Sequence, residues 1–236
     1  GVPGTGKTLT AKAVANTLRV PLLDFDAGRV MDKWVGSSEA RMREVFALAE
    51  AMAPCVLRID EIEKAFGRSG GDYDSGASAH VLGAFLTWMQ EKSKPVFVVA
   101  TANDVTRLPA EFLRKGRFDE IFAVDLPTLM ERYEIVEIHL RARGRKPDAF
   151  SVNAIAEACD GFSGAEIAEA IVSALYTAFD AGREVNTEDI IAAIHETTPL
   201  SETMAEQILA VRQWAATRAR PAGAPRDTKK GRNVTV

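Results

Sequence analysis

Features that would place this sequence in several other protein classes are scarce or absent. Only 2 of its 236 residues are cysteine and only 3 are histidine. Cys55 and Cys159 lie far apart in apolar stretches, so we predict two buried free thiols in a reducing compartment rather than a disulfide. The segment "HETTP" at 195–199 lacks the second histidine of the His-Glu-x-x-His motif, which excludes a fused zinc protease.

Excess charge and long apolar runs are also missing. The net charge is -4 and the sequence pI is about 5.6, so the chain has no overall attraction to nucleic acid or to anionic lipid. No apolar run is long enough for a membrane span, and no secretory leader is visible. We therefore expect no nucleic-acid partner, no membrane span and a cytoplasmic location.

What is present is the pattern of a globular protein with two kinds of domain. Up to Pro127, apolar runs at 21–25, 55–59, 96–102 and 121–124 alternate with helical periodicity at 7–18, 38–53 and 77–91. This pattern predicts an α/β fold, a parallel sheet flanked by helices. From 128 onward only helical segments are expected, at 128–143, 152–159, 164–181, 187–197 and 201–219. We predict an α/β domain at 1–127, a small all-α domain at 128–200, a C-terminal helix at 201–219 and a disordered basic tail at 220–236.

The first eight residues, "GVPGTGKT", fit the phosphate-loop pattern G-x-x-x-x-G-K-[ST]. Glycines let the backbone wrap closely around phosphates, and the N-terminus of the following helix adds partial positive charge. We expect Lys7 to reach the β- and γ-phosphates and the Thr8 hydroxyl to bind Mg²⁺. The residues predicted to contact the nucleotide in this segment are Pro3, Gly4, Thr5, Gly6, Lys7, Thr8 and Leu9.

Two acidic residues follow the apolar strand at 55–59, at the end where open α/β sheets bind their ligands. We expect Asp60 to hold the metal, and Glu61 to be the base that polarises the attacking water. The alternative is that the two acids only begin the helix near Ile62, where its dipole favours them. Arg58 has no firm explanation on a covered strand, where it could extend its charged end to an edge or pair with an acid such as Asp24 or Asp26.

The strand at 96–102 also ends in polar residues. Asn103 could hydrogen-bond the attacking water or the γ-phosphate, or it could belong to a simple Asn-Asp turn. GTP-binding switches carry an Asn-Lys-x-Asp motif that reads the base, and "TAND" at 101–104 lacks the lysine.

With these motifs in this order, the sequence resembles the AAA ATPases, ring-forming motors with an α/β domain and a helical lid. It is most similar to a bacterial, cyanobacterial and plastid branch, through "LTWMQEKSKPVFVVATAND" and "LRKGRFDEIF". The resemblance implies ATP and Mg²⁺ as cofactors, with the plastid stroma as the location in a plastid-bearing source. It also implies that Arg114 and Arg117 are arginine fingers for the nucleotide of the next subunit, and that Gly164-Ala165 approach the nucleotide from the lid.

Lys33, Trp34, Val35 and Gly36 resemble the family's pore loop, in which an aromatic side chain grips an extended polypeptide. The alternative is a tryptophan packed in the core before a helix. The resemblance implies a homo-oligomeric ring, of six subunits, that remodels or threads a protein substrate or works with an adaptor. The alternative function is a nucleotide-dependent switch that binds a partner without threading.

The family's order also implies a further central strand that runs directly into the phosphate loop. That strand is not in this sequence, which begins at Gly1. We therefore expect a fragment truncated upstream of Gly1, with two strands left unpaired on one side and feeble ATP hydrolysis.

Overall fold

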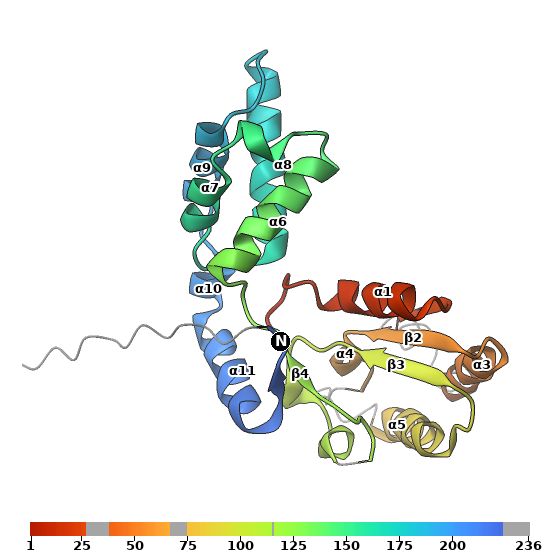
Figure 1. Cartoon of the computed structure of the whole chain (residues 1–236). Helices are drawn as coiled ribbons and strands as arrows, with labels where there is room; N and C mark the ends of the chain where they lie inside the picture. The colour runs from red at the N-terminus through yellow and green to blue at the C-terminus, as the bar shows by residue number, and fades with distance from the viewer. Residues whose placement is uncertain (27–37, 67–74, 115, 224–236) are drawn as a thin grey trace, which may run out of the picture. The chain divides into compact units, whose positions relative to one another are not determined.

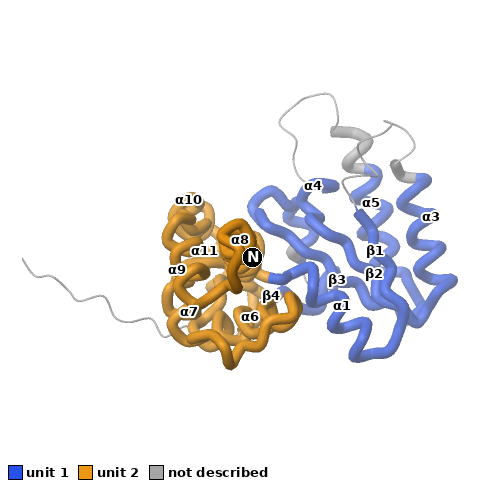
Figure 2. Tube along the Cα trace, turned by 90° about the horizontal axis from the view of Figure 1, so that it is seen from above, with its two compact units in different colours: residues 1, 6–121 blue, residues 2–5, 122–236 orange. Residues whose placement is uncertain are grey.

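A computed structural model describes residues 1–26, 38–66, 75–114 and 116–223 of the chain. The chain forms two compact units, one of residues 1 and 6–121 and one of residues 2–5 and 122–236 (Figure 2). The first is an α/β unit and the second is mainly helical. Residues 2–5, the first half of the glycine-rich loop, thus belong to the helical unit.

A parallel sheet forms the centre of the α/β unit. Its strands β1 (Leu22–Asp26), β2 (Cys55–Asp60) and β3 (Val96–Ala100) lie in the order β1-β2-β3. β2 is the most buried because its run of apolar residues lies between two neighbours. β3 pairs only with β2 in the part of the chain that the structure describes, and Phe97 on it is 54% exposed.

Helices cover both faces of this sheet (Figure 1). α1 (Lys7–Leu18) lies on one face, and α3 (Ser38–Ala51) and α5 (Ser75–Glu91) lie on the other. The latter face holds the main core, in which Phe85 contacts the rings of Phe46, Phe66 and Phe112. The short helix α4 (Ile62–Phe66) follows β2, and the 3-10 turns η1 (Val105–Arg107) and η2 (Ala110–Leu113) follow β3. The predicted α/β class is confirmed.

The helical unit has its own core. Its helices are α6 (Leu129–Ala142), α7 (Val152–Ala158), α8 (Gly164–Asp180), α9 (Thr187–His195), α10 (Leu200–Thr203) and α11 (Ala205–Arg218), with a 3-10 turn η3 at Pro147–Ala149. Capping boxes begin α6, α8 and α9 and satisfy the free N–H groups there. The apolar faces of α6 to α9 pack together around residues such as Ile155, Ile167 and Ile190.

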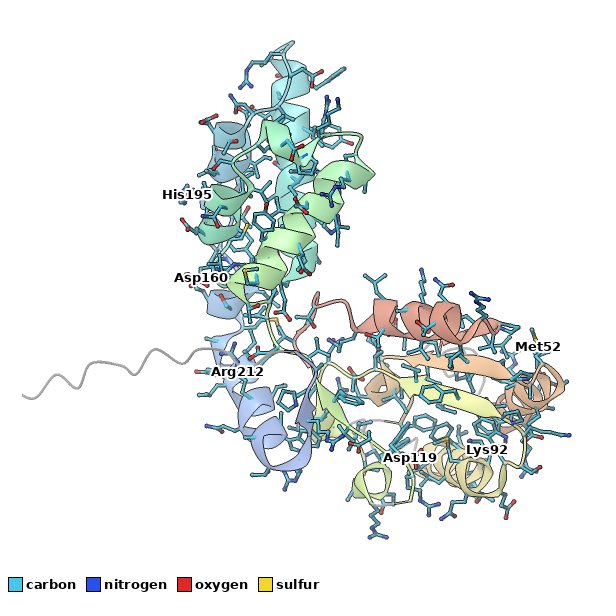
Figure 3. The ribbon with its side chains drawn as sticks, viewed as in Figure 1. Met52, Lys92, Asp119, Asp160, His195 and Arg212 are labelled. Carbon is cyan, nitrogen blue, oxygen red and sulfur yellow. The ribbon has the colours of Figure 1, made fainter. Side chains whose placement is uncertain are left out.

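One expectation about secondary structure is wrong. The sequence predicted no strand after position 128, but Arg220–Pro221 forms β5, which pairs in parallel with β4 (Phe122–Ala123). Because the pairing joins segments about a hundred residues apart, local periodicity carries no signal for it. Arg212 on α11, labelled in Figure 3, lies nearby in this unit and donates to Asp125 through Nε at 2.9 Å and Nη2 at 2.9 Å.

Cys55 belongs to the core of the α/β unit and Cys159 to the core of the helical unit. Cys55 and Cys159 are both buried free thiols, as predicted. Burial raises the pKa of the Cys159 thiol to about 12, although the Arg132 charge opposes the shift. Among the described helices, none combines the length and apolar character needed to cross a membrane.

Candidate functional site

The glycine-rich loop is held by contacts at both of its ends. In the helical unit, Val2 is 1% exposed and its N–H donates to the Val124 carbonyl at 3.0 Å. In the α/β unit, Gly6 is the N-cap of α1 and its carbonyl accepts the Leu9 N–H at 2.9 Å. Gly4 and Gly6 have φ of 73° and 83°, conformations that side chains disfavour. The loop thus takes the shape that its glycines allow, with a helix N-terminus directly after it.

Lys7 carries the positive charge of this loop. Its Nζ donates to the Gly1 carbonyl at 3.0 Å. Burial lowers the pKa of Lys7 to about 8, against the charges of Glu63, Asp60 and Glu61, which raise it. A phosphate group is a favourable partner for this partly buried charge, because a hydrogen bond between charged groups is stronger than a neutral one.

Thr8 and Asp60 come together although they are 52 residues apart. The Thr8 hydroxyl lies 3.2 Å from each carboxylate oxygen of Asp60, the last residue of β2. Asp60 also accepts a hydrogen bond from the Thr101 hydroxyl. Hydroxyl and carboxylate oxygens are the hard ligands that Mg²⁺ takes in proteins, completed by waters and phosphate oxygens. The side chains present therefore fit this metal.

Glu61 lies at the turn between β2 and α4, and its backbone has a φ of 49°. Its N–H donates to the Thr101 hydroxyl at 3.1 Å. Its Oε1 accepts the Asn103 amide at 2.9 Å, and its Oε2 pairs with Lys64. This ion pair raises the pKa of Lys64. A positive φ in a residue other than glycine is strained, and such strain is concentrated at functional sites.

The two predicted arginine fingers follow η2 in the α/β unit. The Arg114 side chain is exposed. Arg117 is half-buried and donates to the Leu86 carbonyl at 3.2 Å. In the described part of the chain, neither guanidinium has a hydrogen bond or an ion pair to Asp60 or Glu61.

In the helical unit, Gly164 and Ala165 form the first turn of α8. The Ala165 N–H donates to the Gly4 carbonyl at 3.0 Å, within the same unit. This contact joins the predicted lid residues to the first half of the loop. The predicted pore loop, Lys33 to Gly36, lies outside the described residues.

Three side chains near the site had no clear role in the sequence. Arg58 is paired with Asp24, one of the two expected partners, at 2.6 Å, and its Nη2 is 3.9 Å from Asp60. Thr101 and Glu63 were not anticipated. The available signal for Thr101 was that a polar residue ends an apolar strand. The only signal for Glu63 was that an acid is favourable at the start of a helix.

Comparisons with known proteins identify the family of this chain. A profile described as "ATPase family associated with various cellular activities (AAA)" matches residues 1–126, and one described as "AAA+ lid domain" matches residues 149–192. The uncharacterised AAA domain-containing protein ycf46 of Pyropia yezoensis is 49% identical over 216 residues, covering 91% of this chain and 44% of that protein. The proteasome-activating nucleotidase of Aeropyrum pernix is 36% identical over 202 residues, covering 83% and 49%.

A solved structure supports the fold. The crystal structure of the FIGL-1 AAA domain in complex with ADP has a TM-score of 0.77 and 23% identity, and covers 93% of this chain and 76% of that one. Fold and loop together define a P-loop nucleotide-binding domain with a helical lid. The chain belongs to the AAA ATPase family, as the resemblance implied, and spans less than half the length of the ycf46 relatives, 44% in that of Pyropia yezoensis.

Proposed function

We propose that this protein is a Mg²⁺-dependent ATPase that works as a ring and remodels protein substrates. The observation that carries the proposal is the convergence of Thr8, Asp60, Glu61 and Asn103 at the carboxyl end of the parallel strands, directly after a phosphate loop. Parallel α/β sheets bind their ligands at this edge. Glycine-loop N–H groups and Lys7 supply the positive field that a triphosphate requires.

Thr8 and Asp60 would hold the metal, the hydroxyl as a ligand and the carboxylate directly or through a water. When bound, Mg²⁺ neutralises negative charge on the phosphate oxygens. The Thr101 hydroxyl holds one oxygen of Asp60 and receives the Glu61 N–H, so it fixes the two neighbouring acids relative to each other.

Glu61 is the group suited to accept a proton from water. Its side chain is 38% exposed, so water has access to it, and the Asn103 amide donates to its Oε1 at 2.9 Å. Lys64 pairs with the other oxygen of Glu61. Each carboxylate oxygen has two lone pairs, so Oε2 retains a site for water beside Lys64.

The two arginines support the proposed ring. Arg114 is exposed and neither arginine pairs with the acids of its own site, so a neighbouring nucleotide is their fitting target. A guanidinium supplied by a neighbour is worth about 10³–10⁵ in rate in related phosphoryl-transfer systems. The protein substrate is supported by the proteasome-activating nucleotidase among the relatives and by the resemblance of Trp34 to a pore residue.

The test replaces Glu61 by glutamine in the protein expressed from its gene. Glu61→Gln keeps the shape and the Asn103 contact but loses the base, so ATP hydrolysis falls by about 10²–10⁴-fold while ATP binding persists. Glu91→Gln, an exposed acid of the same unit, is the matched control and leaves the rate unchanged. Phosphate release and nucleotide binding are measured over a range of protein concentrations.

Activity per chain rises with protein concentration if the arginines act across subunits. Absence of hydrolysis in the unmodified protein contradicts the proposed ATPase. A full rate in Glu61→Gln contradicts the role of Glu61 as the base. If the specific activity does not depend on protein concentration and the particles have the size of a monomer throughout, the proposed ring is contradicted but the ATPase is not.

A further inference from the structure

Glu63 is a buried acid beside the site that the proposed reaction does not use. It lies in α4 and is only 4% exposed. Its Oε1 accepts the backbone N–H of Asn103 at 2.9 Å and that of Asp104 at 3.4 Å. Its Oε2 is buried and has no hydrogen-bond partner among the described residues. A carboxylate at this depth is unfavourable unless something nearby compensates for it.

Two features of the site compensate for the buried charge. The first is the pair of backbone N–H groups of Asn103 and Asp104, because a hydrogen bond to an ionised acceptor is about twice as strong as one to a neutral acceptor. The second is Lys7, because Glu63 is the largest of the three carboxylate influences that raise the pKa of Lys7 against its burial. Glu63 thus touches the chain after β3 and faces the positive charge of the phosphate loop.

The contacts of Asn103 show what this acid does. Glu63 holds the backbone of Asn103, while the amide of the same residue donates to Glu61 at 2.9 Å. Glu61 and Glu63 are two residues apart in the same segment. The Ile62 N–H between them donates at 2.9 Å to the carbonyl of Thr101, the residue that follows β3. Asn103 is therefore fixed at its main chain and at its side chain by two acids from the same segment.

We propose that Glu63 is a positioning residue for ATP hydrolysis, which holds the main chain of Asn103 so that its amide reaches Glu61. The effect on the rate of hydrolysis rests on the proposed function, whereas the hold of Glu63 on the main chain of Asn103 does not. Glu63 touches neither nucleotide nor water in this role and acts only through Asn103. A misplacement of about 1 Å in a positioned group lowers rates about 10²-fold.

The kinetic test is a double-mutant cycle between Glu63→Ala and Asn103→Ala, with Glu91→Ala as the matched control. Glu63→Ala lowers kcat about 10²-fold and leaves the Kd for ATP within about threefold. In the Asn103→Ala background the same change has little further effect, because the two residues act as a unit. Equal losses in both backgrounds overturn the inference, since a merely structural role adds to any other defect.

Conservative variants separate hydrogen bonding from folding. Glu63→Gln keeps an acceptor for the two N–H groups, so kcat stays within about threefold of the unmodified protein. Glu63→Asp shortens the side chain by one methylene, which moves the acceptor away from the N–H groups and lowers kcat about tenfold. If Glu63→Ala does not fold, Glu63→Asp takes its place in the double-mutant cycle. A well-folded Glu63→Gln that is as slow as Glu63→Ala refutes the assignment.

A measurement without nucleotide keeps this inference apart from the proposed function. Amide hydrogen exchange at Asn103 and Asp104 is expected to accelerate at least about tenfold in Glu63→Ala and to remain slow in Glu63→Gln. Unchanged exchange in Glu63→Ala overturns the inference whether or not the protein hydrolyses ATP. Accelerated exchange in a protein without ATPase activity supports the positioning contact and overturns only the proposed function.

Discussion

Replacing Gly4 by alanine tests how the glycine-rich loop is held. Gly4 has φ of +73°, and a Cβ built there lies 2.7 Å from the Ser163 hydroxyl oxygen and 3.2 Å from the Ala165 Cβ. Ser163 cannot easily move away, because it is 2% exposed and caps α8 by accepting the Glu166 N–H. The Gly4 carbonyl also accepts the Ala165 N–H at 3.0 Å, so any shift of the loop strains this bond as well.

The expected loss has two parts. A left-handed conformation in a residue with a Cβ costs about 1–2 kcal/mol, and displacing the Ser163 cap costs about 1 kcal/mol more. Gly144→Ala is the matched control in the same unit, because Gly144 has φ of +71° and nothing lies within 4 Å of its added Cβ. Gly4→Ala should therefore lower the free energy of unfolding by about 1 kcal/mol more than Gly144→Ala does.

Urea unfolding followed by circular dichroism measures this difference, and amide exchange of residues 163–167 locates it. Faster exchange in the first turn of α8 is expected for Gly4→Ala and not for Gly144→Ala. Equal stability losses and equal exchange in the two variants would refute the packing of Gly4 against Ser163.

Two further predictions follow from buried cations. Because burial lowers the pKa of Lys7 to about 8, Lys7 is charged below that pH and loses its attraction for phosphate above it. The Kd for ATP should therefore rise about tenfold between about pH 7 and about pH 9 but stay flat in Lys7→Arg, as titration calorimetry can measure, and a flat wild-type profile contradicts the shift. In the helical unit, Arg132 is 7% exposed and binds the Ala156 carbonyl at 2.8 Å and Asp160 at 2.9 Å. Arg132→Met should lower the free energy of unfolding by about 2–4 kcal/mol in a urea titration, whereas the exposed Arg141→Met should change it by less than about 0.5 kcal/mol, and similar losses in both would contradict the role of burial.

Much of the fold was predictable because its signals are local. The apolar run of β2 and the amphipathic pattern of α8 depend on neighbouring residues only, and both elements form within two residues of their expected bounds. Asp60 at the end of β2 follows from the same local reasoning, since an apolar strand in a parallel sheet ends at the ligand-binding edge. The pairing of β4 with β5 was missed because it depends on distant segments.

The sequence by itself determined the chemistry available to this protein: a glycine loop with Lys7 and Thr8, two acids after one strand and Asn103 after the next. These motifs depend only on residue type and on spacing along the chain, and both can be taken directly from the sequence. Only the tertiary structure decided which groups meet. Glu63 accepts the backbone N–H of Asn103. The Thr101 hydroxyl donates to Asp60 and accepts the Glu61 N–H. The Gly4 carbonyl accepts the Ala165 N–H. The contacts of Glu63 and Thr101 arise because parallel strands bring their carboxyl ends together across many residues of intervening chain. The contact of Gly4 with Ala165 joins segments that are still further apart in the sequence. No local sequence pattern shows which distant segments meet.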